Sequence, residues 1–90
     1  SLRHHKPQQT SLLARILSHK AWALGQLGEL QEAIDMSQES LSMRRLKKDA
    51  QGVTDSLNNL ATLLRRKGAF VQARSLWEEA LELARKESDI

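Results

Sequence analysis

Apolar residues recur at spacings of three and four along nearly the whole chain, and the pattern breaks at Gly28 and Gly68. This spacing is typical of an amphipathic α-helix, whose period of 3.6 residues places such side chains on one face. An isolated glycine after an apolar run indicates a helix end, because glycine adopts positive φ there at little steric cost. The pattern therefore predicts helices over residues 8–27, 29–47, 50–67 and 69–87.

The connections between these helices are short. Turns as short as those at Gly28 and Gly68 join antiparallel helices. Asp49 precedes the third helix and is a favourable N-cap, since its carboxylate can accept a backbone N–H of the first turn. Residue types that favour helices dominate, and the chain has a single proline, Pro7. The sequence predicts an all-α fold of two tandem antiparallel helix hairpins.

The two hairpins are related by an internal repeat. Shifting the sequence by 40 positions brings glycines, small residues and leucines into register together, which scattered chance identities do not do. The identical pairs include Leu17/Leu57, Ala21/Ala61, Leu24/Leu64, Gly28/Gly68, Ala33/Ala73 and Leu41/Leu81. The alanines among them let neighbouring helices approach closely, since bulky residues there would overpack the seam. We therefore expect one repeat over residues 10–49, a second over 50–90, and a partly disordered tail over 1–9.

The second repeat carries a family signature. Its stretches Leu57–Leu64, Gly68–Ala73 and Trp77–Leu83 closely resemble a tetratricopeptide repeat. The period of 40 residues, instead of about 34, resembles the long-repeat variants of kinesin light chains, of Leu-Gly-Asn-repeat adaptors and of bacterial regulators. The resemblance implies an α-solenoid fragment in which Trp77 is a core residue.

The first repeat departs from this pattern at several positions. Lys20 stands where leucine is usual. Ser37 and Ser40 stand where an aromatic residue and an alanine are expected. The first repeat is therefore the less regular of the two.

The resemblance also implies a binding site. In tetratricopeptide arrays the first helix of each repeat lines a concave groove that holds partner peptides. The matching positions are Arg15, Ser18, His19, Trp22 and Gln26 in the first repeat, and Asp55, Asn58, Asn59, Thr62, Arg65 and Arg66 in the second. The implied function is a non-enzymatic module that binds a protein or peptide, as a piece of a larger scaffold or regulator.

The residue types at these positions suit a peptide. The Asn59 amide offers an acceptor and two donors to an extended backbone, although it could instead bond locally. Arg65 and Arg66 offer forks for carboxylates, which favours an acidic partner, although cations also suit any helix C-terminus. Trp22 lies off the core line and is either an exposed anchor or a partly buried surface residue.

Composition excludes several other functions. The chain has no cysteine, so it has neither a disulfide framework nor a thiolate metal site. His4, His5 and His19 lack the spacing of metal ligands, no glycine-rich phosphate loop is present, and we expect neither cofactor nor catalysis. The net charge is only +3 and aromatic residues are few, which argues against nucleic acid. No apolar run could span a bilayer, so we expect a cytoplasmic protein without a membrane partner.

Two alternatives remain open at this point. The fourth helix should have an uncovered apolar edge, because arrays of this kind usually need about three repeats and a polar cap. The chain could therefore self-associate through its repeat ends as a homo-oligomer. It could also serve as the sensor part of a regulator that carries a catalytic or DNA-binding domain elsewhere.

Overall fold

The computed structural model describes residues 7–88, which form four α-helices and no strand: α1 (Pro7–Gln26), α2 (Leu30–Leu46), α3 (Ala50–Lys67) and α4 (Phe70–Ser88). The all-α prediction is thus confirmed, and each boundary lies within one or two residues of the expected one. Residues 7–9, which overlap the predicted tail, belong to α1. The rest of the tail, residues 1–6, lies outside the described residues.

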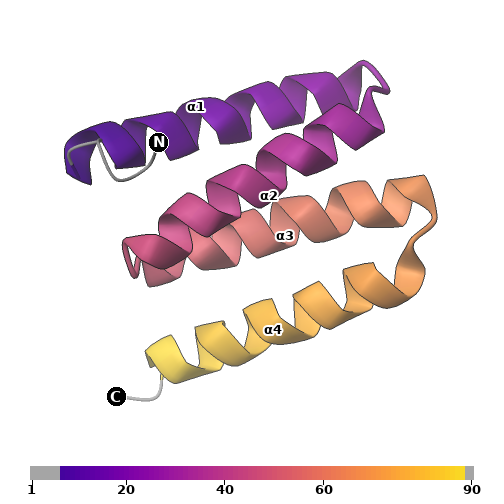
Figure 1. Cartoon of the computed structure of the whole chain (residues 1–90). Coiled ribbons are helices and arrows are strands. Elements are labelled where there is room, and N and C mark those ends of the chain that lie inside the picture. Colours follow the sequence, from indigo (N-terminus) through magenta and orange to yellow (C-terminus); the bar gives the residue numbers. More distant parts are fainter. Residues whose placement is uncertain (1–6, 89–90) are drawn as a thin grey trace.

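The helices follow one another as two antiparallel hairpins, α1/α2 and α3/α4 (Figure 1). Helix α2 packs against both α1 and α3, and α3 packs against both α2 and α4. Consequently α1 and α3 run in the same direction and come into contact along part of their length. The molecule measures 35 × 33 × 17 Å, so its shortest dimension is less than two helix diameters of about 10–12 Å each.

The three turns close the helices in the same way. Glu29, Asp49 and Ala69 each donate their backbone N–H to a carbonyl five residues earlier, which satisfies an otherwise unpaired helix-end carbonyl. Gly28 and Gly68 take positive φ values of 87° and 99°, as the sequence predicts. The turn between α2 and α3 uses Lys48 at φ 56°, a left-handed conformation that costs a non-glycine residue roughly 1–2 kcal/mol.

The buried core follows the internal repeat. Leu57 is fully buried at the centre of the cluster, between α2 and α4. The paired alanines Ala21, Ala61, Ala33 and Ala73 are all buried, which confirms that small residues line the helix contacts. The further members of the cluster are Ile34, Leu41, Val53, Leu60, Leu63, Leu64 and Ala80.

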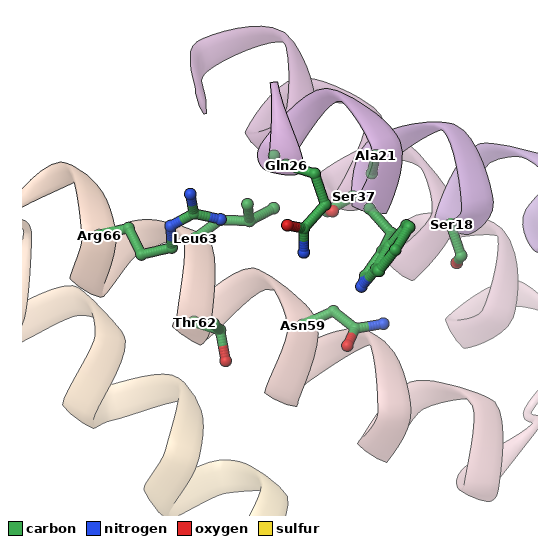
Figure 2. A pocket seen from close by; sticks show the side chains of 10 residues that line it. Ser18, Ala21, Gln26, Ser37, Asn59, Thr62, Leu63 and Arg66 are labelled. Atoms are coloured by element: carbon green, nitrogen blue, oxygen red, sulfur yellow. The ribbon is translucent and has the colours of Figure 1, made fainter. Parts of the chain in front are cut away.

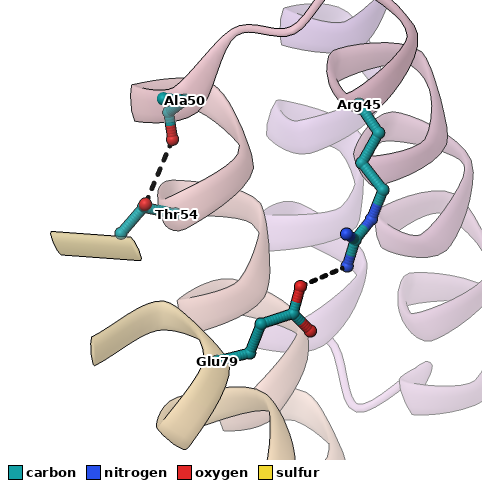
Figure 3. A network of polar contacts seen from close by, with 4 residues as sticks. All are labelled: Arg45, Ala50, Thr54 and Glu79. Carbon is teal, nitrogen blue, oxygen red and sulfur yellow. Dashed lines mark hydrogen bonds and ion pairs between the residues drawn. The ribbon is translucent and has the colours of Figure 1, made fainter. Parts of the chain in front are cut away.

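Polar contacts fix the two hairpins against each other. The Asp49 carboxylate accepts the Gly52 N–H at 3.0 Å, so the expected N-cap of α3 is present. Arg44 of α2 donates to the Gly52 carbonyl at 3.2 Å and to the Ser56 hydroxyl at 2.8 Å. Arg45 of α2 also donates to the Glu79 carboxylate of α4 at 2.8 Å, and within α3 the Thr54 hydroxyl donates to the Ala50 carbonyl at 3.1 Å (Figure 3).

Helix α4 has a large exposed apolar stripe. Trp77 is 36% exposed, so its expected place in the core is wrong in this structure. Leu81 is 61% exposed, whereas Leu41, its counterpart in the first repeat, is buried. The reason is that α2 is covered on two sides, by α1 and by α3, whereas α4 rests on α3. Trp77 and Leu81 therefore line an open hollow with Thr54 and Ala84.

Candidate functional site

A groove runs between α1 and α3 and consists of three adjoining hollows. Ser18 from α1 and Asn59 from α3 line all three, so the hollows are continuous. Toward the start of both helices the groove is bounded by Arg15 and Asp55. We call this concavity the α1/α3 groove. It is open to solvent along its length, as a site for an extended ligand must be.

The groove contains nearly every residue that the family resemblance implied. The first repeat contributes Arg15, Ser18, His19, Trp22 and Gln26, and the second contributes Asp55, Asn58, Asn59, Thr62 and Arg66. Trp22 is 67% exposed and its side chain lines the groove.

Arg65 is the exception, since it lines none of the three hollows. It is equivalent by the 40-residue period to Gly25. Gly25 lies on the flank of α1 that faces α3, where an added Cβ would come within 2.9 Å of Leu63. Arg65 lies on the equivalent flank of α3. Because α1 and α3 are parallel, that flank faces away from α1, so Arg65 points away from the groove.

Several polar side chains of the groove are unpartnered within the described chain. The amides of Asn59 and Gln26 make no hydrogen bond with any described residue, so the local bonding considered for Asn59 does not occur. Others are occupied: the Thr62 hydroxyl donates to the Asn58 carbonyl at 2.9 Å, and Asp55 accepts from Gln51 at 3.0 Å. The groove therefore presents Asn59 and Gln26 as available donors and acceptors.

The charge of the groove is positive. Arg15 and Arg66 are exposed and form no ion pair with any residue that the structure describes. Arg44, which also lines the groove, is held by the Ser56 hydroxyl. Asp55 is the acidic residue among those lining the hollows. Cations without an internal partner, set on both sides of an Asn, suit an acidic or carboxylate-bearing ligand.

The most enclosed of the three hollows is a pocket of about 200 Å³ near the C-terminal ends of α1 and α3. Its walls are partly apolar, from Ala21, Trp22, Gly25 and Leu63, and Ser37 of α2 contributes to its lining. In Figure 2 the Gln26 amide and the Arg66 guanidinium extend from opposite walls into the same space. The family positions on α1 and α3 did not identify Ser37 or Leu63 as lining residues. One feature of the sequence pointed to Ser37 as unusual: the equivalent position of the second repeat is an aromatic residue, Trp77.

Two bonded hydroxyls, Ser40 and Ser18, join α2 to α1 at the groove. Ser40 of α2 is fully buried, donates to the Ala14 carbonyl at 2.9 Å and bonds the Ser18 hydroxyl at 2.9 Å. Buried hydroxyls are costly unless they are bonded, and here the bonds tie α2 to α1. Ser40 thereby positions Ser18, the residue shared by all three hollows.

Other kinds of site have little support in the described part of the chain. Residues 11–87 contain no group of three His, Cys, Asp or Glu side chains close enough to share a metal ion. His4 and His5 lie outside the described residues. No described helix combines the length and the apolar character that crossing a membrane requires.

Comparison with known proteins identifies the family. A family model described as tetratricopeptide repeat matches residues 13–46 and again residues 53–88. The two matches begin 40 positions apart, in agreement with the internal repeat, and together they cover most of the chain. No curated protein and no solved structure shows a significant match. With its two hairpins and its groove between first helices, the chain belongs to the tetratricopeptide repeat family.

Proposed function

We propose that the chain is a protein-interaction module that binds an extended segment of a partner protein in the α1/α3 groove. The observation that carries this proposal is the unpartnered Asn59 amide at the middle of a continuous concavity. An amide can both donate to and accept from the backbone of an extended peptide, whose N–H and C=O groups need partners when they lie against the groove.

The charges of the groove favour an acidic partner. Arg15 is equivalent by the 40-residue period to Asp55, which lies eleven residues before Arg66 on the parallel helix α3, so the two arginines lie toward opposite ends of the groove. Eleven helical residues correspond to roughly 16 Å, which an extended segment of about five residues spans. Carboxylates near both ends of such a segment would meet a guanidinium each.

Peptides displayed at random on phage, selected on the full chain and then synthesised with a fluorophore, provide the test. We expect Asn59→Ala and Arg66→Glu to weaken peptide binding about fivefold and tenfold or more, by fluorescence anisotropy. Arg65→Glu is the matched control, because it makes the same change of charge on the adjacent residue, outside the groove. Equal losses for Arg65→Glu and Arg66→Glu, or unchanged affinity of Asn59→Ala, would contradict the groove assignment.

A second candidate function rests on the exposed stripe of α4. Trp77 and Leu81 lie on one face of the helix and line an open hollow. We propose as the alternative that this face mediates self-association. Sedimentation velocity would then show a dimer that Leu81→Glu dissociates. A monomer over the full concentration range, unchanged by that substitution, contradicts the alternative.

The wider context follows from the same proposal. The 40-residue period supports assignment to the long-repeat variants, the kind of repeat found in kinesin light chains, Leu-Gly-Asn-repeat adaptors and bacterial regulators. A groove of this kind suits a scaffold or a regulator in the cytoplasm. Pull-down of a defined partner from a cytosolic fraction, lost with Asn59→Ala, is the measurement for this context.

A further inference from the structure

The pocket at Ser37 is the feature of the groove that the repeat pattern leaves unexplained. Ser37 is equivalent to Trp77 by the 40-residue period, so the first repeat has a hydroxymethyl group where the second has an indole. Ser37 lines the pocket, and a larger side chain on the same Cα would extend into it. The pocket thus occupies space that an aromatic residue of the first repeat could otherwise fill.

The Ser37 hydroxyl is also buried without a partner. Ser37 is only 3% exposed, and its side chain makes no hydrogen bond with any described residue. Ser40, one turn farther along the same helix, shows the contrast, because its hydroxyl is fully satisfied by Ala14 and Ser18. A buried hydroxyl without a partner is unfavourable, and a ligand that bonds it would remove that cost. We therefore expect the occupant of the pocket to have a polar atom that bonds the Ser37 hydroxyl.

The size and walls of the pocket define the rest of the occupant. About 200 Å³ is below the range of roughly 300–1,000 Å³ of small-molecule and cofactor sites, and is suited to a single side chain. Trp22 and Leu63 provide apolar and aromatic walls. An aromatic ring packs well beside Trp22, in an offset or edge-to-face arrangement. The occupant should therefore have an aromatic body and a hydroxyl end.

We infer that the pocket takes a tyrosine side chain of the bound partner, with its ring between Trp22 and Leu63 and its hydroxyl bonded to Ser37. The inference rests on the proposed function, since it assumes that a peptide lies in the α1/α3 groove. The partner thus supplies the aromatic side chain that the first repeat lacks at position 37. The cation at the rim, Arg66, places a carboxylate of the same segment next to the tyrosine.

The test compares tyrosine with phenylalanine in one peptide. Sequences enriched from random phage-displayed peptides on the full chain should carry tyrosine at one fixed position beside Asp or Glu. The selected peptide and its Tyr-to-Phe version are then measured by fluorescence anisotropy against four forms of the chain: wild type, Ser37→Ala, Ser37→Phe and Ser42→Ala. Ser42 is the matched control, because it is an exposed serine of the same helix that lines none of the hollows. Circular dichroism and thermal melting confirm that each form is folded.

We expect the wild type to bind the tyrosine peptide about fivefold more tightly than the phenylalanine peptide, the worth of one net hydrogen bond. The ratio should fall to about one for Ser37→Ala and stay unchanged for Ser42→Ala. Ser37→Phe should lose both peptides at least tenfold without melting at a lower temperature, because its own ring fills the pocket. The ratio is internal to each form, so a general loss of stability does not alter it.

Two outcomes overturn the inference. Enriched peptides without tyrosine that still depend on Asn59 and Arg66 would refute the tyrosine pocket while leaving the proposed function intact. A tyrosine preference that survives in Ser37→Phe would place the tyrosine elsewhere. If no peptide binds in a way that depends on Asn59 or Arg66, the proposed function itself fails, and the inference fails with it.

Discussion

The repeat makes Leu17 and Leu57 equivalent in sequence, but the structure gives them different surroundings. Leu57 is 0% exposed and lies on α3, which packs against α2 on one side and α4 on the other. Leu17 is partly exposed on α1, outside the buried cluster. The same truncation at the two positions therefore tests how burial depends on the place of a helix in the stack.

The magnitudes follow from what each truncation removes. Leu57→Ala deletes three buried carbons and leaves a cavity bounded by helices on both sides, which should destabilise the chain by about 3–4 kcal/mol. Leu17→Ala removes side-chain surface that is already partly in water and leaves no closed cavity, so we expect about 1–2 kcal/mol. The difference of about 2 kcal/mol lies well above the error of a denaturation curve.

Urea denaturation followed by circular dichroism at the helix band measures both changes. A chain of 90 residues has about 5–13 kcal/mol of total stability by its size, so Leu57→Ala should remain partly folded at zero denaturant. If Leu57→Ala is unfolded at zero denaturant, an osmolyte such as trimethylamine oxide, added to all forms, raises their free energy of unfolding into the measurable range. Equal destabilisation by the two substitutions would mean that Leu17 on α1 and Leu57 on α3 are equally buried, contrary to the structure.

Two further predictions concern the helix ends. Asp49→Ala removes the carboxylate that accepts the Gly52 N–H and should cost about 1 kcal/mol in a urea melt, with Asp49→Asn nearly neutral; an unchanged midpoint for the alanine form would contradict the cap. Gly68→Ala should destabilise by about 1 kcal/mol because φ is 99° there, whereas Lys48→Gly should be neutral or stabilising because φ is 56°. Thermal melts that shift the same way for both would contradict the assigned turns.

The parts of the fold that depend on short-range patterns could be predicted from the sequence. Gly28, Gly68 and Asp49 mark helix ends through local backbone chemistry, and the structure places them as expected. The groove was implied by the family resemblance and not by the periodicity itself. Its geometry agrees because residues equivalent by the repeat lie on equivalent faces of α1 and α3.

Long-range packing explains what the sequence did not provide. Trp77 matches a core position of the family, but whether that position is covered depends on the helices beside α4 and not on α4 itself. Arg65 lies next to Arg66 in sequence, yet a turn of about 100° between successive helical residues sends it to the other flank of α3. Ser37 departs from the aromatic residue at the equivalent position of the second repeat. That this departure leaves a pocket follows only from the packing of α2 against α1 and α3.

The two tryptophans allow a direct test of whether a ligand binds in the α1/α3 groove. Trp22 lies at the groove and Trp77 on the exposed face of α4, so an ¹H–¹⁵N spectrum contains two indole signals, which Trp77→Phe assigns. Titration with a selected peptide should shift the Trp22 indole together with the side-chain amides of Gln26 and Asn59, and leave the Trp77 indole in place. A shift of Trp77 with Trp22 unmoved would contradict the account and assign binding to α4.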